Sequence, residues 1–280
     1  MGLFDAFRYD GKRVLVVGGA TGMGAAVVQV VKDAGAEVVV MDRADVDVDG
    51  VKFIRLDLSD KASIESAIDE CGGPLDALFE CAGVADGTPG IERINFIGHR
   101  HLVERAIDKG YVGRGGAIGF ISSAAGFGWQ NNLKITKEFL AITDFDEATK
   151  WAQDNGKADY MFSKLTINTY VAQQAFPMLK KGIRINAIMP GPTDTPLARA
   201  NADMWLGFGQ DYRDETGIEP STPLEQAYPL VFLCSDAAAG VTGITMVTDA
   251  GYFASGVVES FEPAGPVVGF LSGPKYGDAS

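Results

Sequence analysis

The chain has 280 residues, of which 46 % are hydrophobic and 22 % charged, a balance that is ordinary for a globular protein of one or two domains. Its net charge of −13 argues against nucleic acid and anionic membranes as partners, because both select a basic surface. No apolar run approaches the ~20 residues that span a bilayer, and no secretory signal is visible, so we expect neither a membrane protein nor a secreted one.

Strands and helices alternate along the chain. Runs of branched apolar residues predict strands at 13–18, 37–41, 52–56, 75–79, 117–121, 183–188 and 244–247. Apolar residues at helical spacing predict helices at 23–32, 59–70 (opened by Ser59 as N-cap), 92–109 and 159–180. The strands are almost continuously apolar, which indicates an α/β fold: a doubly wound, mostly parallel sheet of seven strands with helices on both faces.

The first strand runs into a glycine-rich loop, GGATGMG. Gly18, Gly22 and Gly24 do not follow the dinucleotide fingerprint G-x-G-x-x-G. The loop still joins a strand to a helix N-terminus, whose free N–H groups and positive dipole end favour a pyrophosphate. A purely structural turn is the alternative.

Two carboxylates follow the next strands. Asp42, twenty residues after Gly22, can accept hydrogen bonds from both hydroxyls of an adenosine ribose and would repel a 2′-phosphate. We therefore expect NAD rather than NADP, although the neighbouring Arg43 could attract that phosphate. Asp57, at the end of the third strand, either meets the adenine amino group or is a turn residue.

A tyrosine and a lysine stand four residues apart in YMFSK. Tyr160 and Lys164 would be adjacent on one face of a helix. The spacing alone is a weak signal, and it gains weight from the strand ending in ISS upstream and from the phosphate-type loop.

These motifs together resemble the short-chain dehydrogenase/reductase family. GGATGMG, LDALFECAG, INFIG, ISSAAG, YMFSK, INAIMPGPTDTP and VTDAG occur in the family order over about residues 12–256. The chain is most similar to the single-domain branch, in particular to the bacterial 3α-hydroxysteroid dehydrogenase/carbonyl reductase subgroup. The resemblance implies a Rossmann fold and an NAD(P)-dependent interconversion of an alcohol and its carbonyl.

The resemblance also implies a set of catalytic residues. These would be Asn95, Ser123, Tyr160 and Lys164, with Ser122 as the alternative to Ser123. A free tyrosine has a pKa near 10, and a neighbouring lysine ammonium together with a cationic nicotinamide ring should lower it. The serine would hydrogen-bond the substrate oxygen, the lysine would also hold the nicotinamide ribose, and the asparagine would hold a water of the proton relay.

Binding residues follow from the same resemblance. The cofactor would contact Gly18, Ala20, Thr21, Gly22, Met23, Gly24, Asp42, Asp57, Leu58, Cys81, Ala82, Gly83, Tyr160, Lys164, Pro190, Gly191, Thr193 and Thr195. The substrate would contact Ser123, Phe127, Tyr160, Pro192 and Trp205. The stretch ECAG departs from the family's usual Asn-Asn-Ala-Gly, a change that removes two amides which tie this loop to the sheet.

Two segments do not fit the alternation of strands and helices. Residues 127–157 lengthen the gap between Ser123 and Tyr160; we expect one or two short helices there, acting as a lid or as an oligomer contact. Residues 257–280 form a Pro/Gly-rich extension beyond a catalytic domain of residues 1–256. The extension either reaches a neighbouring subunit through Phe270 and Leu271 or frays. A homo-oligomer, dimer or tetramer, is expected.

The histidines and cysteines show no pattern typical of a metal site. His99 and His101 point to different sides of a helix, so they cannot share a metal ion; both are interpreted as structural or interface residues, and no metal is expected. The three cysteines (Cys71, Cys81 and Cys234) have no metal-like spacing and indicate reduced thiols in a cytoplasmic protein.

The substrate and the rival functions rest on less specific patterns. Aromatic residues in 127–157 and after Thr195 favour a bulky apolar alcohol such as a steroid, terpenoid, alicyclic or aromatic alcohol. One rival is a non-catalytic NAD(P)-binding regulator on the same fold, which typically loses the Tyr–Lys pair. A second is a sugar-nucleotide epimerase, which is longer and has a different glycine spacing.

Overall fold

A computed structural model describes residues 2–272. Seven strands form one sheet in the order β3-β2-β1-β4-β5-β6-β7, and all neighbouring strands are parallel. The strands are β1 (Arg13–Val17), β2 (Glu37–Asp42), β3 (Val51–Arg55), β4 (Leu75–Glu80), β5 (Val112–Ile121), β6 (Arg184–Pro190) and β7 (Thr245–Thr248). The predicted doubly wound fold is therefore confirmed.

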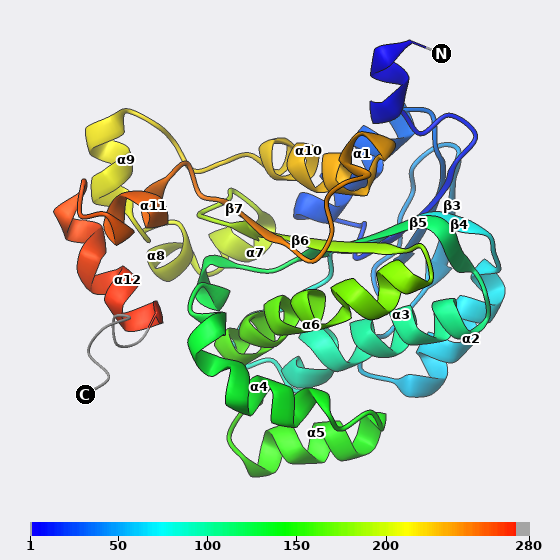
Figure 1. The fold of residues 1–280 in the computed structure, drawn as a ribbon, viewed down its shortest axis with the longest axis horizontal. Coiled ribbons are helices and arrows are strands. Elements are labelled where there is room, and N and C mark those ends of the chain that lie inside the picture. Colours follow the sequence, from blue (N-terminus) through cyan, green and yellow to red (C-terminus); the bar gives the residue numbers. More distant parts are fainter. Residues whose placement is uncertain (1, 273–280) are drawn as a thin grey trace.

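Helices cover both faces of the sheet (Figure 1). On one face lie α1 (Gly22–Asp33) and α10 (Pro223–Cys234); on the other lie α2 (Lys61–Cys71), α3 (Gly98–Asp108) and α6 (Tyr160–Lys180). Side chains of β1 alternate between the two resulting cores, with Leu15 in one and Val14 in the other. Both faces are buried, which is why the strands read as continuous apolar runs. Within residues 2–272, we find no helix with the length and apolar character needed to cross a membrane.

Some element boundaries differ from the sequence prediction. The N-cap of α2 is Asp60, whose side chain accepts a hydrogen bond from the Ala62 amide, so the assignment of Ser59 was wrong. The expected helix 92–109 begins as a π-helical turn, η2 (Arg93–Ile97), before α3. Turns of this kind are frequently found at functional sites.

The segment 127–157 forms short helices, as predicted. These are η4 (Trp129–Asn132), α4 (Leu133–Leu140) and α5 (Phe145–Asp154). They pack on α6 and η2, away from the sheet, and Phe139 is only 2 % exposed (Figure 1). Side chains of α4 and α5 are anchored in the main hydrophobic core, which favours a structural role for this segment over the expected lid.

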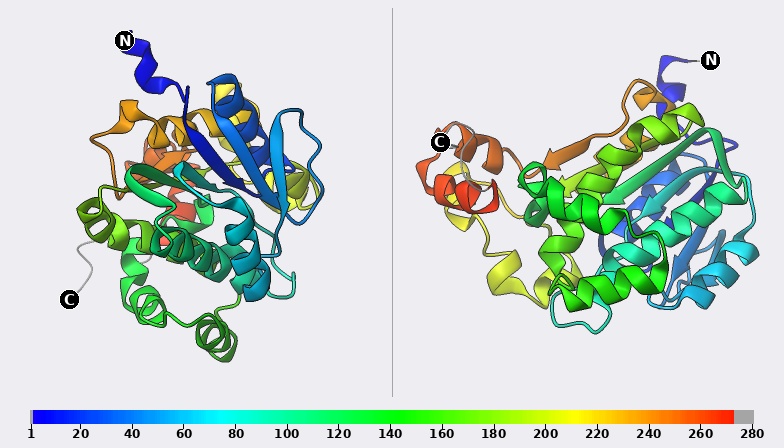
Figure 2. Two further views of the ribbon diagram at one scale, coloured as in Figure 1. Left: turned by 90° about the vertical axis from the view of Figure 1, so that its right-hand side faces the viewer. Right: turned by 60° about the horizontal axis from the view of Figure 1, so that its bottom comes forward.

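A second group of short helices projects from one side of the molecule and contacts η4 of the first group (Figure 2). It contains α7 (Pro196–Arg199), α8 (Ala202–Trp205), α9 (Gln210–Thr216), α11 (Tyr252–Val257), η6 (Glu262–Ala264) and α12 (Gly265–Ser272). Leu271 of α12 packs against this chain's own aromatic cluster, so it is not free to anchor a neighbouring subunit, whereas Phe270 is exposed. The remainder of the predicted extension, 273–280, lies outside the described residues.

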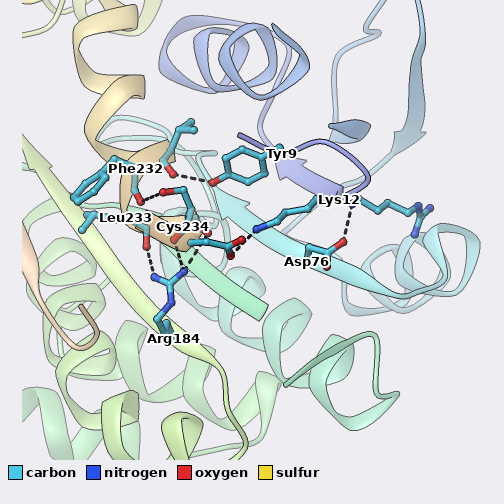
Figure 3. Close-up of polar contacts among 11 residues, drawn as sticks. Tyr9, Lys12, Asp76, Arg184, Phe232, Leu233 and Cys234 are labelled. Carbon is cyan, nitrogen blue, oxygen red and sulfur yellow. Dashed lines mark hydrogen bonds and ion pairs between the residues drawn. The ribbon is translucent and has the colours of Figure 1, made fainter. Parts of the chain in front are cut away.

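The C-terminal end of α10 is capped by a buried arginine at the start of β6 (Figure 3). The guanidinium of Arg184 donates to the carbonyl oxygens of Leu233 (2.5 Å), Cys234 (3.2 Å) and Ser235 (2.8 Å). Because the last carbonyl groups of a helix have no partners within it, these bonds satisfy buried acceptors, of which the Leu233 oxygen also accepts from Asn186 (3.5 Å).

Candidate active site

A cleft of about 310 Å³ lies at the carboxyl ends of β1, β2 and β4. The chain passes from β1 outward to β2 and later back to β4 on the other side of β1, so the cleft lies where the strand order reverses, the usual ligand site of such sheets. Of the predicted cofactor residues, the cleft is lined by Gly18, Thr21, Gly22, Met23, Gly24, Asp42, Asp57, Leu58, Cys81, Ala82, Gly83 and Thr195.

The glycine loop has the close backbone packing and the uncapped helix start that suit a phosphate. A Cβ on Gly24 would lie 1.9 Å from the carbonyl oxygen of Gly18, and a Cβ on Gly18 would lie 2.4 Å from the amide nitrogen of Ala82. No side chain caps the first turn of α1, where Thr21 is the N-cap. The amides of that turn therefore face the cleft without a side-chain partner, an arrangement suited to an anion.

The carboxylate of Asp42 is held in place by backbone amides. One oxygen accepts from Ala20 (2.9 Å) and the other from Ala44 (2.9 Å). Arg43, which was considered as a possible phosphate ligand, also lines the cleft. Asp57 lines the cleft and makes the anticipated turn with Ser59, whose hydrogen bonds lower the pKa of its carboxyl group.

Tyr160, Ser123 and Lys164 meet beside this cleft. Tyr160 is the first residue of α6, which Asp159 caps by accepting from the Phe162 amide. The Ser123 side chain lies near the Tyr160 hydroxyl and lowers the pKa of Tyr160. The Lys164 ammonium lies 5.3 Å from the centre of the Tyr160 ring and donates to the carbonyl oxygen of Ile121 (3.0 Å).

Burial dominates the electrostatics of this cluster. Burial raises the pKa of Tyr160 to about 12, against the lowering effect of the nearby Ser123 side chain. The Lys164 ammonium lies over the Tyr160 ring and also donates to the carbonyl oxygen of Ile121. Burial lowers the pKa of Lys164 itself to about 8.

The two neighbouring serines have different surroundings. Ser122 is buried, and its hydroxyl donates to the carbonyl oxygen of Lys164 (3.3 Å). Ser123 lies two residues beyond the end of β5, near Tyr160, and its hydroxyl oxygen accepts from the Ala125 amide (3.2 Å). The hydroxyl of Ser123 is thus the one that reaches Tyr160.

Asn95 lies in the π-helical turn and is fully buried. Its amide group binds both the N–H (2.8 Å) and the C=O (2.9 Å) of Val84. A Cβ on Gly83 would lie 3.6 Å from the Asn95 oxygen and 3.9 Å from the Lys164 ammonium. Asn95 therefore anchors the loop after β4 next to the Tyr–Ser–Lys cluster.

Residues on the predicted substrate side are only partly brought together. The ring of Trp205 lies 5.0 Å from that of Tyr160. Phe127 instead stacks on Phe253 at 4.2 Å, and Pro192 lines a separate small cavity with Phe208.

The remaining predicted cofactor residues do not line the cleft, and Gly191 lines the small cavity that also contains Pro192. Pro190 ends β6 and Gly191 follows it; Thr193 donates to the Gly191 carbonyl (3.0 Å), and Ala20 contacts Asp42. Thr195, which does line the cleft, caps α7 through the Ala198 amide.

Sequence reasoning missed several residues of the site. Asp86 accepts from the backbone amide of Tyr160 (2.7 Å) and raises the pKa of its side chain. Val84, Ile94 and Leu197 line the cleft. Below the loop after β4, Glu80 and His99 form a buried pair. The unusual ECAG stretch was the available signal for that pair.

The sheet order and the position of the cleft define a Rossmann-type α/β protein, and comparisons with known proteins agree. A family model described as "Enoyl-(Acyl carrier protein) reductase" matches residues 18–253. The chain is 28% identical over 249 residues to a coniferyl-alcohol dehydrogenase of a Pseudomonas species, covering 86% of this chain and 96% of the relative. It is 28% identical over 260 residues to the 3-alpha-hydroxysteroid dehydrogenase/carbonyl reductase of Comamonas testosteroni, covering 85% and 95%.

A solved structure shares the fold. The 3-alpha-hydroxysteroid dehydrogenase from Pseudomonas sp. B-0831, complexed with NADH, superposes with a TM-score of 0.71 at 24% identity, covering 89% of this chain and 99% of that one. The chain belongs to the short-chain dehydrogenase/reductase family, whose members bind NAD(P), and it is an oxidoreductase of that family.

Proposed function

We propose that the protein is an NAD-dependent dehydrogenase that interconverts an alcohol, most simply a secondary one, and its carbonyl compound. The observation that carries the proposal is the meeting of Tyr160, Ser123 and Lys164 beside a cleft that has Asp42 at its other end. A binding protein without catalysis would need only the cleft, so the intact cluster favours an enzyme over a regulator.

The side chains divide the work as follows. NAD, when bound, supplies the acceptor for the hydride. The hydroxyl of Tyr160 takes the alcohol proton or returns it to the carbonyl oxygen, and Ser123 hydrogen-bonds the same oxygen. Lys164, cationic below a pKa of about 8, favours the Tyr160 phenolate and holds the ribose of the cofactor. Asn95 keeps the adjoining loop in place, and the family resemblance assigns it a water of the proton relay.

Asp42 supports NAD over NADP. Its carboxylate ends β2 at the cleft, fixed by two backbone amides, so it cannot easily move away from a 2′-phosphate. We expect wild-type protein to bind NAD more tightly than NADP, and Asp42→Ala to narrow that difference. Tighter binding of NADP by wild type, measured by titration, would contradict this assignment.

A bulky, ring-bearing alcohol is the proposed substrate class. Trp205 contributes an aromatic surface next to Tyr160. The names of three relatives point the same way: coniferyl alcohol, a 3-alpha-hydroxysteroid, and cis-4-hydroxycyclohexanecarboxylate (the last from Sinomonas cyclohexanicum, 28% identical) all contain rings. Screening such alcohols with NAD at the absorbance of the reduced nicotinamide identifies the substrate.

We also propose a cytoplasmic homo-oligomer. The three cysteines are free thiols, which suits a reducing compartment. Phe176 and Leu179 of α6 are exposed apolar side chains of the kind that a subunit contact covers. Light scattering of the purified protein measures the assembly.

Tyr160→Phe tests the mechanism. The ring and its packing against Trp205 are kept while the acid–base oxygen is lost, so turnover should fall by roughly 10²–10⁴-fold with NAD affinity retained. Ser122→Ala is the matched control, because that hydroxyl binds only the Lys164 carbonyl and the variant should keep turnover within a few-fold. Turnover of Tyr160→Phe within threefold of wild type would refute the proposed role.

A further inference from the structure

A buried acid–imidazole pair lies directly beneath the cofactor cleft. Glu80 is the last residue of β4 and His99 lies in α3, and each residue is only 1 % exposed. The Nδ1 atom of His99 is hydrogen-bonded to Oε2 of Glu80. Its Nε2 atom lies 3.0 Å from the carbonyl oxygen of Ala82. One imidazole thus bridges the end of a strand and the loop that follows it.

The hydrogen-bond partners determine where the protons lie. A carbonyl oxygen only accepts, so Nε2 of His99 carries a proton and donates it to Ala82. Nδ1 and the Glu80 carboxyl group then share one further proton, either as a neutral pair or as an ion pair. Burial raises the pKa of Glu80, which helps the pair to retain that proton.

Hydrogen bonds hold this loop at three successive places, and the bond to the Ala82 carbonyl is the middle one. Before it, the Cys81 amide donates to the carbonyl oxygen of Val17 in β1 (2.9 Å). After it, both backbone groups of Val84 bind Asn95. Without the His99 bond, the described contacts of the loop would leave the peptide after Ala82 without a side-chain anchor.

The position of this peptide matters to both ends of the cleft. The Ala82 backbone is in close contact with Gly18 of the glycine loop, where a Cβ would approach to 2.4 Å. The next residue, Gly83, lies beside Asn95 and the Lys164 ammonium. A shift of the Ala82 peptide would therefore disturb the proposed pyrophosphate loop and the Tyr–Ser–Lys cluster together.

We propose that Glu80 and His99 are positioning residues that hold the loop 81–83 in its cofactor-binding conformation through the Nε2–H to Ala82 hydrogen bond. Glu80 acts through His99, because its bond to Nδ1 fixes the orientation of the ring. The pair takes the place of the two loop-tying amides that ECAG lacks. The identity of the cofactor rests on the proposed function; the ordering of the loop does not.

Two substitutions of His99 separate the hydrogen bond made by Nδ1 from the one made by Nε2. In H99Q the amide nitrogen occupies the place of Nε2 and still donates to Ala82. In H99N it occupies the place of Nδ1, reaching Glu80 but not Ala82. We expect H99N to weaken NAD binding by roughly tenfold or more, the effect of losing one buried hydrogen bond at a binding loop, and H99Q to restore affinity to within about threefold of wild type.

A readout without cofactor keeps the two proposals distinguishable. Amide hydrogen exchange of the peptide covering residues 80–90 should be at least several-fold faster in H99N than in H99Q or wild type. If wild type does not bind NAD, the proposed function fails, and the exchange measurement still tests the pair. H101N is the matched control: His101 lies on the same helix and contacts Glu65 at the surface (3.3 Å), so both readouts should stay at wild-type values.

The results divide as follows. Slower exchange and tighter binding in H99Q than in H99N support the proposal. Wild-type exchange in H99N, or equal losses in H99N and H99Q at equal melting temperatures, would overturn it. If H99N does not fold, H99Q decides alone: wild-type exchange in that variant supports the role of the Nε2–H bond, and accelerated exchange overturns it.

Discussion

Replacing Phe139 in α4 by alanine tests whether the segment 127–157 belongs to the core. The side chain is 2 % exposed, and its ring centre lies 6.0, 5.3 and 5.4 Å from those of Phe96, Trp151 and Phe162. Phe→Ala in a core costs about 3–5 kcal/mol through lost burial and the cavity left behind. Since the neighbouring rings come from three different elements, they cannot close the cavity by one small shift, and we expect a loss in this range.

The assay is urea unfolding followed by circular dichroism, with wild type and variant at equal concentration. Phe4→Ala serves as the control, because Phe4 is 82 % exposed and its removal should change the free energy of unfolding by less than about 0.5 kcal/mol. A loss below about 1 kcal/mol for Phe139→Ala, together with a raised KM for bulky alcohols, would refute the core assignment and restore the lid.

Two further predictions concern the site. Gly24→Ala places a Cβ 1.9 Å from the carbonyl oxygen of Gly18, and because that atom belongs to the backbone it cannot move aside easily. We therefore expect NAD affinity to fall at least a hundredfold, or the fold to be lost. Gly113→Ala is the control, since a Cβ there meets nothing within 4 Å, and unchanged affinity in Gly24→Ala would count against the loop geometry. Because burial lowers the folded pKa of Lys164 from 10.5 to about 8, the unfolded chain binds more protons between these values, and wild type should gain stability relative to Lys164→Met as pH rises from 7 to 10. Unfolding experiments at pH 7, 8.5 and 10 measure the gain, and a difference independent of pH would mean that the lysine titrates normally.

Much of the fold was predictable because the sheet is buried on both faces. That burial makes β1, β2, β4 and β6 mostly apolar runs, which can be recognised without knowing their neighbours, whereas the edge strands β3 and β7 are only partly buried. α10 was missed because Pro229 interrupts its pattern, although Thr222 and Glu225 form a capping box that marks its start. The helices of 127–157 were anticipated from their spacing, but the side on which they pack was not, since spacing does not identify the partner.

In the candidate site too, residues on one element were predictable, whereas contacts between elements were not. Tyr160 and Lys164 were found because both lie on one helix, four residues apart. Glu80 and His99, by contrast, come from different elements and make contact only when α3 packs against β4. Burial raises the pKa of Tyr160 in the chain without cofactor, and this depth of burial is a property of the fold that a local pattern does not contain.

The cap on α10 has a consequence for how this chain tolerates mutation. The three acceptors at residues 233–235 are main-chain oxygens, which remain present whatever side chains those positions carry. Arg184 donates to all three of these oxygens, and Asn186 adds one longer bond to the Leu233 oxygen (3.5 Å). A lysine in place of Arg184 would offer one nitrogen instead of a planar fork, so selection on this hydrogen-bond network acts mainly on the Arg184 codon. Because that codon lies at the start of β6, whereas the cleft lies at the carboxyl ends of the strands, a missense change there should lower the yield of folded protein while leaving the chemistry of the surviving molecules intact.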